Sequence, residues 1–445
     1  MTMSVTPAGR TTRATVEPAA IPEQRRVLAV LVTAQILSGA GMAAGITVGA
    51  LLAEEMLGTT GLAGLPAALF TSGAALGAMA IGRLSQRWGR RPGLALGYAT
   101  AATGSVGVVV AGTVDSVPLL FLSLVLYGAG SATNLLARYA GADLAPPERR
   151  GRAVSRVLLA TTFGAVLGPN LVGVTGDLAH SWAMPRLVGP FLLAAVAYAL
   201  GGCVLAGWLR PDPLRLAREL AERRAASETG DMTGEGAAGP ETLPAAGPVM
   251  GEDAGGRSAP GVLTGATVMV VGQLVMIAIM TMTPVHMTGH GHSTQAAGLV
   301  IALHVGAMFL PSPLSGLLVD RVGRLRVAAV GSAVLLSAGL LAALASPHSL
   351  PALATALVLL GLGWNLGLVS ATAIITDAVP LDSRAATQGL VDVGVAIAGT
   401  TGGLASGLVV AGSGYGCLAA GGGILSLTVI PVLALTTRPR PRPRT

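Results

Sequence analysis

The sequence predicts an all-α integral membrane protein with twelve transmembrane helices in two six-helix repeats. Hydrophobic residues make up 52% of the 445 residues and charged residues only 11%, against roughly 25% charged in an ordinary soluble domain. A bilayer core of about 30 Å requires about 20 apolar residues in a helix, and the chain holds twelve such stretches. The spans are expected to begin near Val27, Leu62, Pro92, Val117, Val154, Leu187, Val262, Gln295, Arg326, Leu350, Ala385 and Tyr415.

Polar segments divide these spans into two sets of six. A polar tail, residues 1–26, precedes the first half, 27–209. The central linker, 210–261, opens with PDPLRLARELAERR, which is typical of a short amphipathic helix, and continues with Gly-, Glu- and Pro-rich sequence that predicts disorder. The second half, 262–436, is followed by an Arg/Pro tail, 437–445. The first apolar run is too long for the core of a signal peptide, so we expect it to remain as a span.

The arginines predict the orientation of the chain. Positive charge is retained on the cytoplasmic side of a membrane. With both termini and the linker inside, 27 of the 28 arginines lie in cytoplasmic segments or at the cytoplasmic ends of spans, and only Arg186 lies outside. We therefore expect a multi-pass protein of the cell membrane with both termini in the cytoplasm.

The two halves are related by a constant offset of 234 residues. Parallel duplication of a six-span unit is a known transporter plan, with the substrate site between the halves. The offset relates seven pairs in three separate loops: Gly82 and Gly316, Arg87 and Arg321, Gly89 and Gly323, Arg90 and Arg324, Asp143 and Asp377, Pro146 and Pro380, Arg150 and Arg384.

The loop after the second span reads GRLSQRWGRRPG, and its repeat after the eighth span reads GLLVDRVGRLR. Both resemble the signature loop of the major facilitator superfamily, and the resemblance extends over all twelve spans. It implies a secondary transporter whose halves rock about a central site while the two loops hold an inner gate. The gate residues are Gly82, Gln86, Arg87, Gly89 and Arg90 in the first loop, and Gly316, Asp320, Arg321, Gly323 and Arg324 in the second.

Gln86 departs from the signature, which has aspartate at this position, whereas Asp320 keeps it. A neutral amide still accepts a hydrogen bond but lacks the strength that a charge adds. We call the contact by which each signature loop holds the inner gate a latch. We therefore expect the latch of the first half to be weaker or differently partnered. The alternative is that the loop arginines only set the topology.

The fifth span carries FGAVLGPNLVG, which resembles the antiporter motif of the proton-coupled drug exporters. Small residues at this spacing let helices approach closely, and proline bends a helix. Ordinary glycine-rich packing is the alternative. The fourth span has no arginine in its outer half, and Arg138 lies near its cytoplasmic end, so we do not expect coupling through a span-4 arginine. The motif residues are Gly164, Gly168, Pro169 and Gly173.

Two titratable residues inside spans are candidates for proton coupling. Asp392 is the only acidic residue well within a span, where a carboxylate is costly unless it is paired or protonated. His304 in the eighth span is the other, because histidine changes charge near neutral pH. The alternatives are that Asp392 reaches cytoplasmic water near Arg384 and that His304 only bonds a neighbouring helix.

Polar and methionine residues within spans predict a hydrated substrate cavity. Gln273, Met276 and Met280 recur at steps of three and four, so they share a face of the seventh span, and flexible methionine suits varied lipophilic ligands. Packing between spans is the alternative. The candidates are Gln35, Asn134, Asn170, Gln273, Met276, Met280 and Asn365.

The stretch MTMTPVHMTGHGHS places His286, His290 and His292 at the outer end of the seventh span. Three histidines can capture copper or zinc. A transported metal needs ligands near the membrane midplane, however, and no Asp, Glu or Cys accompanies them. We favour histidines that bond helix ends, with metal transport or sensing as alternatives.

Together these features predict a secondary active transporter, and not an enzyme, that exports a small lipophilic organic compound by proton antiport. No nucleotide-binding loop of the Walker type is present, and we expect no cofactor and no nucleic-acid partner. The expected partners are the bilayer, protons and the substrate of a functional monomer. Proton-coupled uptake and a metal-responsive transporter or sensor remain as alternatives.

Overall fold

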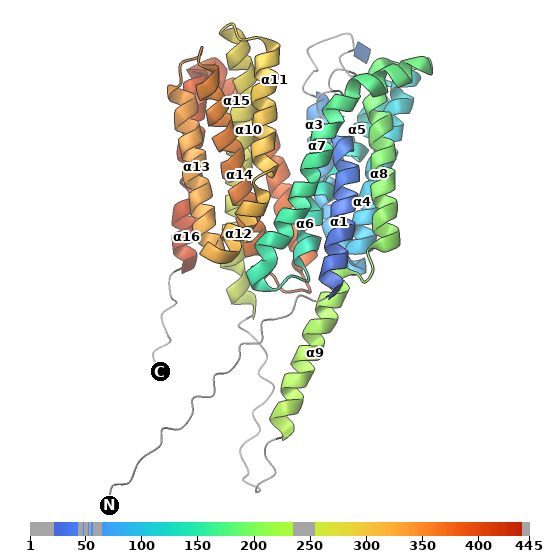
Figure 1. Cartoon of the computed structure of the whole chain (residues 1–445), viewed down its shortest axis with the longest axis vertical. Helices are drawn as coiled ribbons and strands as arrows, with labels where there is room; N and C mark the ends of the chain where they lie inside the picture. The colour runs from blue at the N-terminus through green and yellow to red at the C-terminus, as the bar shows by residue number, and fades with distance from the viewer. Residues whose placement is uncertain are drawn as a thin grey trace, which may run out of the picture.

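The computed structural model describes residues 22–42, 48, 52, 55–56, 65–234 and 254–437, and this part of the chain is helical and contains no strand. The helices form two bundles side by side, one from each half of the chain (Figure 1). The first half contains α1 (Pro22–Met42), α3 (Leu65–Trp88), α4 (Arg90–Thr113), α5 (Val117–Ser131), α6 (Thr133–Ala142), α7 (Arg150–Ser181) and α8 (Gly189–Trp208). The second contains α10 (Ala254–Gly289), α11 (Thr294–Phe309), α12 (Ser312–Val322), α13 (Arg324–Leu344), α14 (Leu350–Ala378), α15 (Arg384–Ser426) and α16 (Val429–Thr437).

These helices confirm the prediction of twelve spans. Nine segments of the described chain are long and apolar enough to cross a bilayer, and α1 and α7 add the first and fifth spans. The last of the nine, Arg384–Ala434, contains two spans, because Gly414 has a φ of 83° and interrupts the helix. The twelfth span therefore starts at Tyr415, as predicted. Two other spans are each made of two helices, α5 with α6 and α11 with α12.

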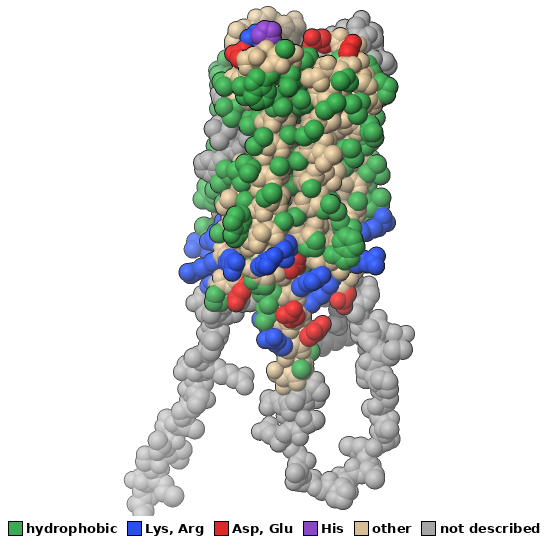
Figure 2. All heavy atoms as spheres, turned by 90° about the vertical axis from the view of Figure 1, so that its right-hand side faces the viewer, with side chains coloured by type: hydrophobic (Ala, Val, Ile, Leu, Met, Phe, Trp, Pro, Cys, Tyr) green, Lys and Arg blue, Asp and Glu red, His purple; other side chains and the backbone are tan. Residues whose placement is uncertain are grey.

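The surface has the charge distribution of a membrane-embedded bundle. On the face shown in Figure 2, hydrophobic side chains cover most of the height of the bundle, and a belt of arginines crosses one end. We call this the arginine-rich end; α1 starts there and α16 ends there (Figure 1). The opposite end carries Arg186, which pairs with Asp177. Large apolar side chains such as Leu344 and Leu408 are 83% and 78% exposed, as expected for residues that face lipid.

The linker forms a longer helix than predicted. Helix α9 (Pro213–Gly234) starts next to the bundle and extends away from it at the arginine-rich end (Figure 1). Asp212 accepts hydrogen bonds from the backbone N–H groups of Leu214, Arg215 and Arg91, so it caps α9 and holds its start against α4. The predicted linker ended at residue 261, but residues 254–261 are helical and form the start of α10. Of the predicted tails, 1–26 and 437–445, residues 22–26 form the start of α1 and Thr437 ends α16. Residues 235–253, 1–21 and 438–445 lie outside the described part of the chain.

Candidate functional site

Asp320 and Gln86 each cap a helix that belongs to the opposite half. The carboxylate of Asp320 accepts hydrogen bonds from the backbone N–H groups of Gly151 (2.8 Å) and Arg152 (3.1 Å) at the start of α7. The amide oxygen of Gln86 accepts from Ala385 (2.7 Å) and Ala386 (3.4 Å) at the start of α15. The 234-residue offset relates these contacts residue by residue. Each cap satisfies N–H groups that have no partner inside the helix.

The two caps differ where the sequence departs from the family signature. The Nε2 atom of Gln86 donates to the backbone oxygens of Leu381 (3.0 Å) and Asp382 (2.5 Å), which a carboxylate cannot do. Asp320 instead adds a charge-assisted bond from Nε of Arg152 at 2.9 Å. Gln86 is therefore differently partnered. Arg218 of α9 also donates to the backbone oxygens of Gln86 and Leu381, so the linker helix touches both halves at this latch.

A Gln86→Asp variant, which restores the family signature, should weaken the latch. The shorter carboxylate loses both donated bonds and brings negative charge close to the backbone oxygens of Leu381 and Asp382, so we expect a loss of about 1–3 kcal/mol from the contact between the halves. The thermal unfolding midpoint of the purified protein should fall relative to wild type. An unchanged or higher midpoint would show that the two donated bonds do not stabilise the latch. Arg83→Gln, at an exposed position of the same helix, is the control.

Glycines allow the halves to meet beside these caps. A Cβ atom on Gly82 would lie 2.8 Å from the backbone oxygen of Ala385 and 2.9 Å from Cα of Gly389. In the repeated contact, a Cβ on Gly316 would lie 2.5 Å from the backbone oxygen of Gly151. Any larger residue at Gly82 or Gly316 would therefore force the helices apart. Gly89 and Gly323 have φ values of 98° and 102°, a conformation that favours glycine in the turn between the helices.

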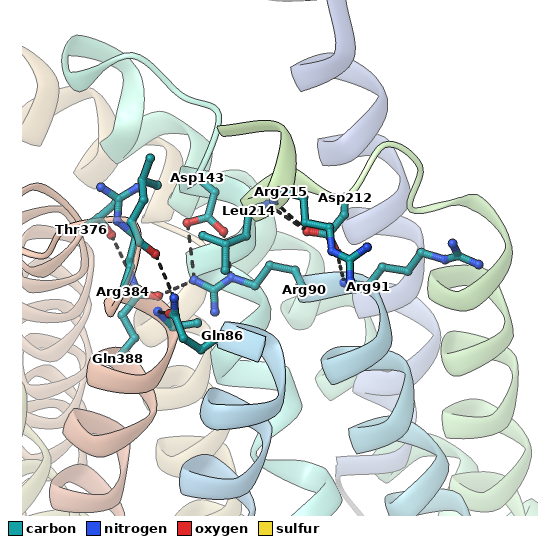
Figure 3. Close-up of polar contacts among 12 residues, drawn as sticks. Gln86, Arg90, Arg91, Asp143, Asp212, Leu214, Arg215, Thr376, Arg384 and Gln388 are labelled. Carbon is teal, nitrogen blue, oxygen red and sulfur yellow. Dashed lines mark hydrogen bonds and ion pairs between the residues drawn. The ribbon is translucent and has the colours of Figure 1, made fainter. Parts of the chain in front are cut away.

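The second signature arginine of each loop, Arg90 or Arg324, forms an ion pair that the repeat relates. Nε of Arg90 lies 2.8 Å from Asp143, and its guanidinium also donates to Gln388 of the other half (Figure 3). The corresponding Arg324 pairs with Asp377. Asp377 also pairs with Arg150 of the first half. The other two signature arginines, Arg87 and Arg321, are exposed. These contacts make a second layer of bonds between the halves at the arginine-rich end.

A buried ion pair also joins the halves. Arg138 on α6 donates to the carboxylate of Asp392 on α15 at 2.7 Å, and the two side chains are 0% and 6% exposed. Nε of Arg138 donates to Thr372 at 3.1 Å, and its guanidinium lies over the ring of Tyr139 at 4.3 Å. Oδ2 of Asp392 has no hydrogen-bond partner in the described part of the chain. Asp392 is thus an intramembrane carboxylate with a single charged partner.

Arg138 was not predicted as a site residue, because the expected arginine was one in the outer half of the fourth span and the inner arginine was not linked to Asp392. Two signals could have found it. A buried arginine within a span needs a partner, and Asp392 was the only acidic residue well within any span. The repeat offset also relates Arg138 to Thr372, which it contacts.

His304 lies inside the second half and not between the halves. Its Nδ1 atom is 2.8 Å from the backbone oxygen of Leu357 on α14, and its side chain is buried. Nε2 has no partner among the described residues. The histidine therefore joins α11 to α14 of one half, and its position gives it no contact with the latches.

Two of the cavity candidates belong to a buried polar cluster of the first half. Gln35 donates to Thr161 and to the backbone oxygen of Asn134, each at 2.9 Å. Asn134 accepts from Ser38 at 2.8 Å and donates to Tyr198 at 3.1 Å. Gln35 is 0% and Asn134 3% exposed. In this conformation they join helices within the half and are not open to a ligand.

The other cavity candidates lie in the second half, except Asn170. Asn365 is fully buried and donates to the backbone oxygen of Met308 and to Ser312, where the eighth span breaks. Gln273 accepts from the indole of Trp364 at 2.8 Å. Met276 is buried in the apolar core, and Met280 packs against it. This face of α10 therefore packs within its half in this conformation. The side chain of Asn170 lies outside the described residues.

The antiporter-like motif lies in the continuous helix α7. The side chains of residues 163–170, which include Gly164, Gly168 and Pro169, are outside the described part. A Cβ on Gly173 would meet nothing within 4 Å, so the close helix approach that we expected is not made at Gly173 in this conformation.

The outer histidines bond or stack on neighbouring groups. His290 contacts the backbone oxygen of His286 at 2.7 Å, and His292 contacts that of Pro347 at 2.9 Å. The ring of His286 stacks on Tyr415 with 4.3 Å between centroids. No group of three His, Cys, Asp or Glu residues that could hold a metal occurs among the described residues.

Known proteins resemble this chain along nearly its full length. The family model described as Major Facilitator Superfamily matches residues 31–253 and 263–445. The uncharacterized MFS-type transporter YdeG of Bacillus subtilis is 53% identical over 409 residues, which cover 92% of this chain and 91% of YdeG. The riboflavin transporter RfnT of Brucella anthropi is 30% identical over 370 residues, 83% of this chain and 85% of RfnT. The crystal structure of the human organic anion transporter MFSD10 superposes with a TM-score of 0.69 at 17% identity, covering 93% of this chain and 100% of that one.

Proposed function

The chain belongs to the major facilitator superfamily and is a secondary transporter; on that premise we propose that it exchanges protons for a small organic compound and exports the compound. The arginine-rich end faces the cytoplasm, because positive charge is retained there. The bonds between the halves that are described above lie towards this end. The conformation is therefore one in which the cytoplasmic gate is closed.

The observation that carries the coupling proposal is the buried pair of Arg138 and Asp392. A proton that binds the carboxylate of Asp392 removes the charge that holds Arg138 to the other half. The attraction between the halves then weakens, because a neutral partner forms a weaker bond than a charged one. Protonation thus favours an open cytoplasmic side, and loss of the proton favours the closed conformation.

The latches and the ion pair form a two-state element of the kind that alternating access needs. A ligand moves such an equilibrium only if it binds the two states differently. In the proposed cycle, a proton from outside opens the inner gate and leaves into the cytoplasm, after which the compound binds in its place. The partial antiporter motif on α7 supports export over uptake.

Proton flux in proteoliposomes tests this function. We would load vesicles with an acidic interior and add lipophilic cations, neutral drugs, metabolites and riboflavin in turn, with a pH-sensitive dye inside. Release of protons on adding one organic class is the expected result. Flux of the compound with no proton movement, or proton uptake together with the compound, would contradict antiport.

Uptake of a flavin-like compound is a second candidate. RfnT is a riboflavin transporter and is similar over most of both chains. The Arg138–Asp392 pair serves a symporter equally well, since a proton and substrate together can release the gate. Entry of labelled riboflavin that is driven by an inward proton gradient would favour this candidate over export.

A further inference from the structure

A basic pocket lies on the surface of the first half, between the start of α1 and the start of α7. It has a volume of about 150 Å³. Four of its lining residues are arginines, and none of its lining residues is acidic. The arginines are Arg25, Arg149, Arg152 and Arg156.

The repeat shows that the fold does not require this cluster. The offset of 234 residues relates Arg149, Arg152 and Arg156 to Ser383, Ala386 and Leu390 of the second half. The same helix start in that half thus works without a single arginine at these three positions. Retention of positive charge on one side of the membrane does not explain why three of them gather beside Arg25.

The pocket lies at the arginine-rich end, beside an exposed face of α1. Arg25 shares a face of α1 with Ala29, Thr33 and Ile36, and all four are exposed. The hydroxyl of Thr33 bonds the backbone oxygen of Ala29, so beyond Arg25 this face presents mainly apolar surface, which we call the apolar stripe. Leu28 lines the pocket. Gln24 also lines it and is 6% exposed; its Nε2 donates to the backbone oxygen of Gly141, and its Oε1 has no partner among the described residues.

We propose that this pocket binds the phosphate of an anionic phospholipid headgroup. Guanidinium groups bind phosphate oxygens through two parallel N–H bonds, and the apolar stripe of α1 accommodates the acyl chain. Arg152 also bonds Asp320, so the bound phosphate neutralises the arginine cluster directly beside one latch. Anionic lipid therefore relieves the repulsion among these arginines and stabilises the folded protein.

The test compares the full-length wild-type protein with two charge-matched double variants. Arg25→Gln/Arg156→Gln removes two pocket arginines that are exposed and take no part in the latch. Arg83→Gln/Arg326→Gln removes two exposed arginines of the same belt that do not line the pocket. Phosphatidylglycerol is titrated into detergent micelles of each protein, and retained lipid is counted by native mass spectrometry. The thermal midpoint is followed in the same samples.

Each arginine near a membrane surface contributes roughly a fivefold factor in affinity for anionic lipid. We therefore expect the pocket variant to bind phosphatidylglycerol about thirtyfold more weakly and to lose the lipid-dependent rise in midpoint. The belt variant should keep both. Equal losses in the two variants would overturn the proposal in favour of general attraction to the belt. The same rise with phosphatidylcholine, or with inorganic phosphate alone, would also overturn it.

Discussion

An Arg138→Met variant should be destabilised by about 3–5 kcal/mol, because it leaves the carboxylate of Asp392 buried without its charged partner. Methionine fills much of the same volume, so the loss reports the missing charge more than a cavity. The thermal unfolding midpoint in detergent should fall well below that of wild type. Both members of the pair must be probed, since the single variant alone does not separate pairing from packing.

The double variant Arg138→Met/Asp392→Leu is the matched control for pairing. Replacing a buried ion pair by apolar residues of similar volume is often neutral or stabilising. The double variant should therefore recover most of the midpoint that Arg138→Met loses. A double variant as unstable as the sum of its two single variants would mean that the two side chains do not act as a pair.

Asp392→Asn should abolish proton coupling. Asparagine cannot take up a proton and is permanently neutral, so the halves lose a charge-assisted bond worth about 1.5–3 kcal/mol. The equilibrium should move roughly tenfold to a hundredfold towards an open arginine-rich end at every pH. Movement of the compound down its own gradient should persist, whereas proton exchange should stop.

Spin labels can follow the gate in this variant. The positions Arg83 on α3 and Arg326 on α13 are exposed and lie in opposite halves. The exposed Cys203 and Cys417 must first be replaced by serine. In wild type, acid should lengthen the distance between the labels; in Asp392→Asn the distance should be long and independent of pH. Proton exchange by Asp392→Asn at the wild-type rate would exclude Asp392 as the proton carrier.

Local sequence rules were sufficient for the spans but not for the contacts between them. The start of the twelfth span near Tyr415 was predicted from apolar length along the chain, whereas the positive φ of Gly414, which separates it from the eleventh span, was not predicted. Gln35, Asn134 and Asn365 look alike as polar residues inside spans. Their burial in bonded clusters depends on which way each helix face turns, and no local pattern states this.

The asymmetry of the latches shows the same limit. The sequence identified Gln86 as a departure from the signature and predicted a latch that is weaker or differently partnered. It could not identify those partners as the backbone oxygens of Leu381 and Asp382, which are about 300 residues away along the chain.

By itself the sequence determined the membrane class, the twelve spans, the duplication and the family, because these depend on composition, on apolar length and on spacing along the chain. Only the tertiary structure decided the partners of the charged residues: Arg138 with Asp392, Arg150 with Asp377, and the four arginines around one pocket. A buried charge requires a partner of opposite charge, but the sequence contains many charged residues that could supply one. The packing of the two halves selects one of them by bringing it within hydrogen-bond distance.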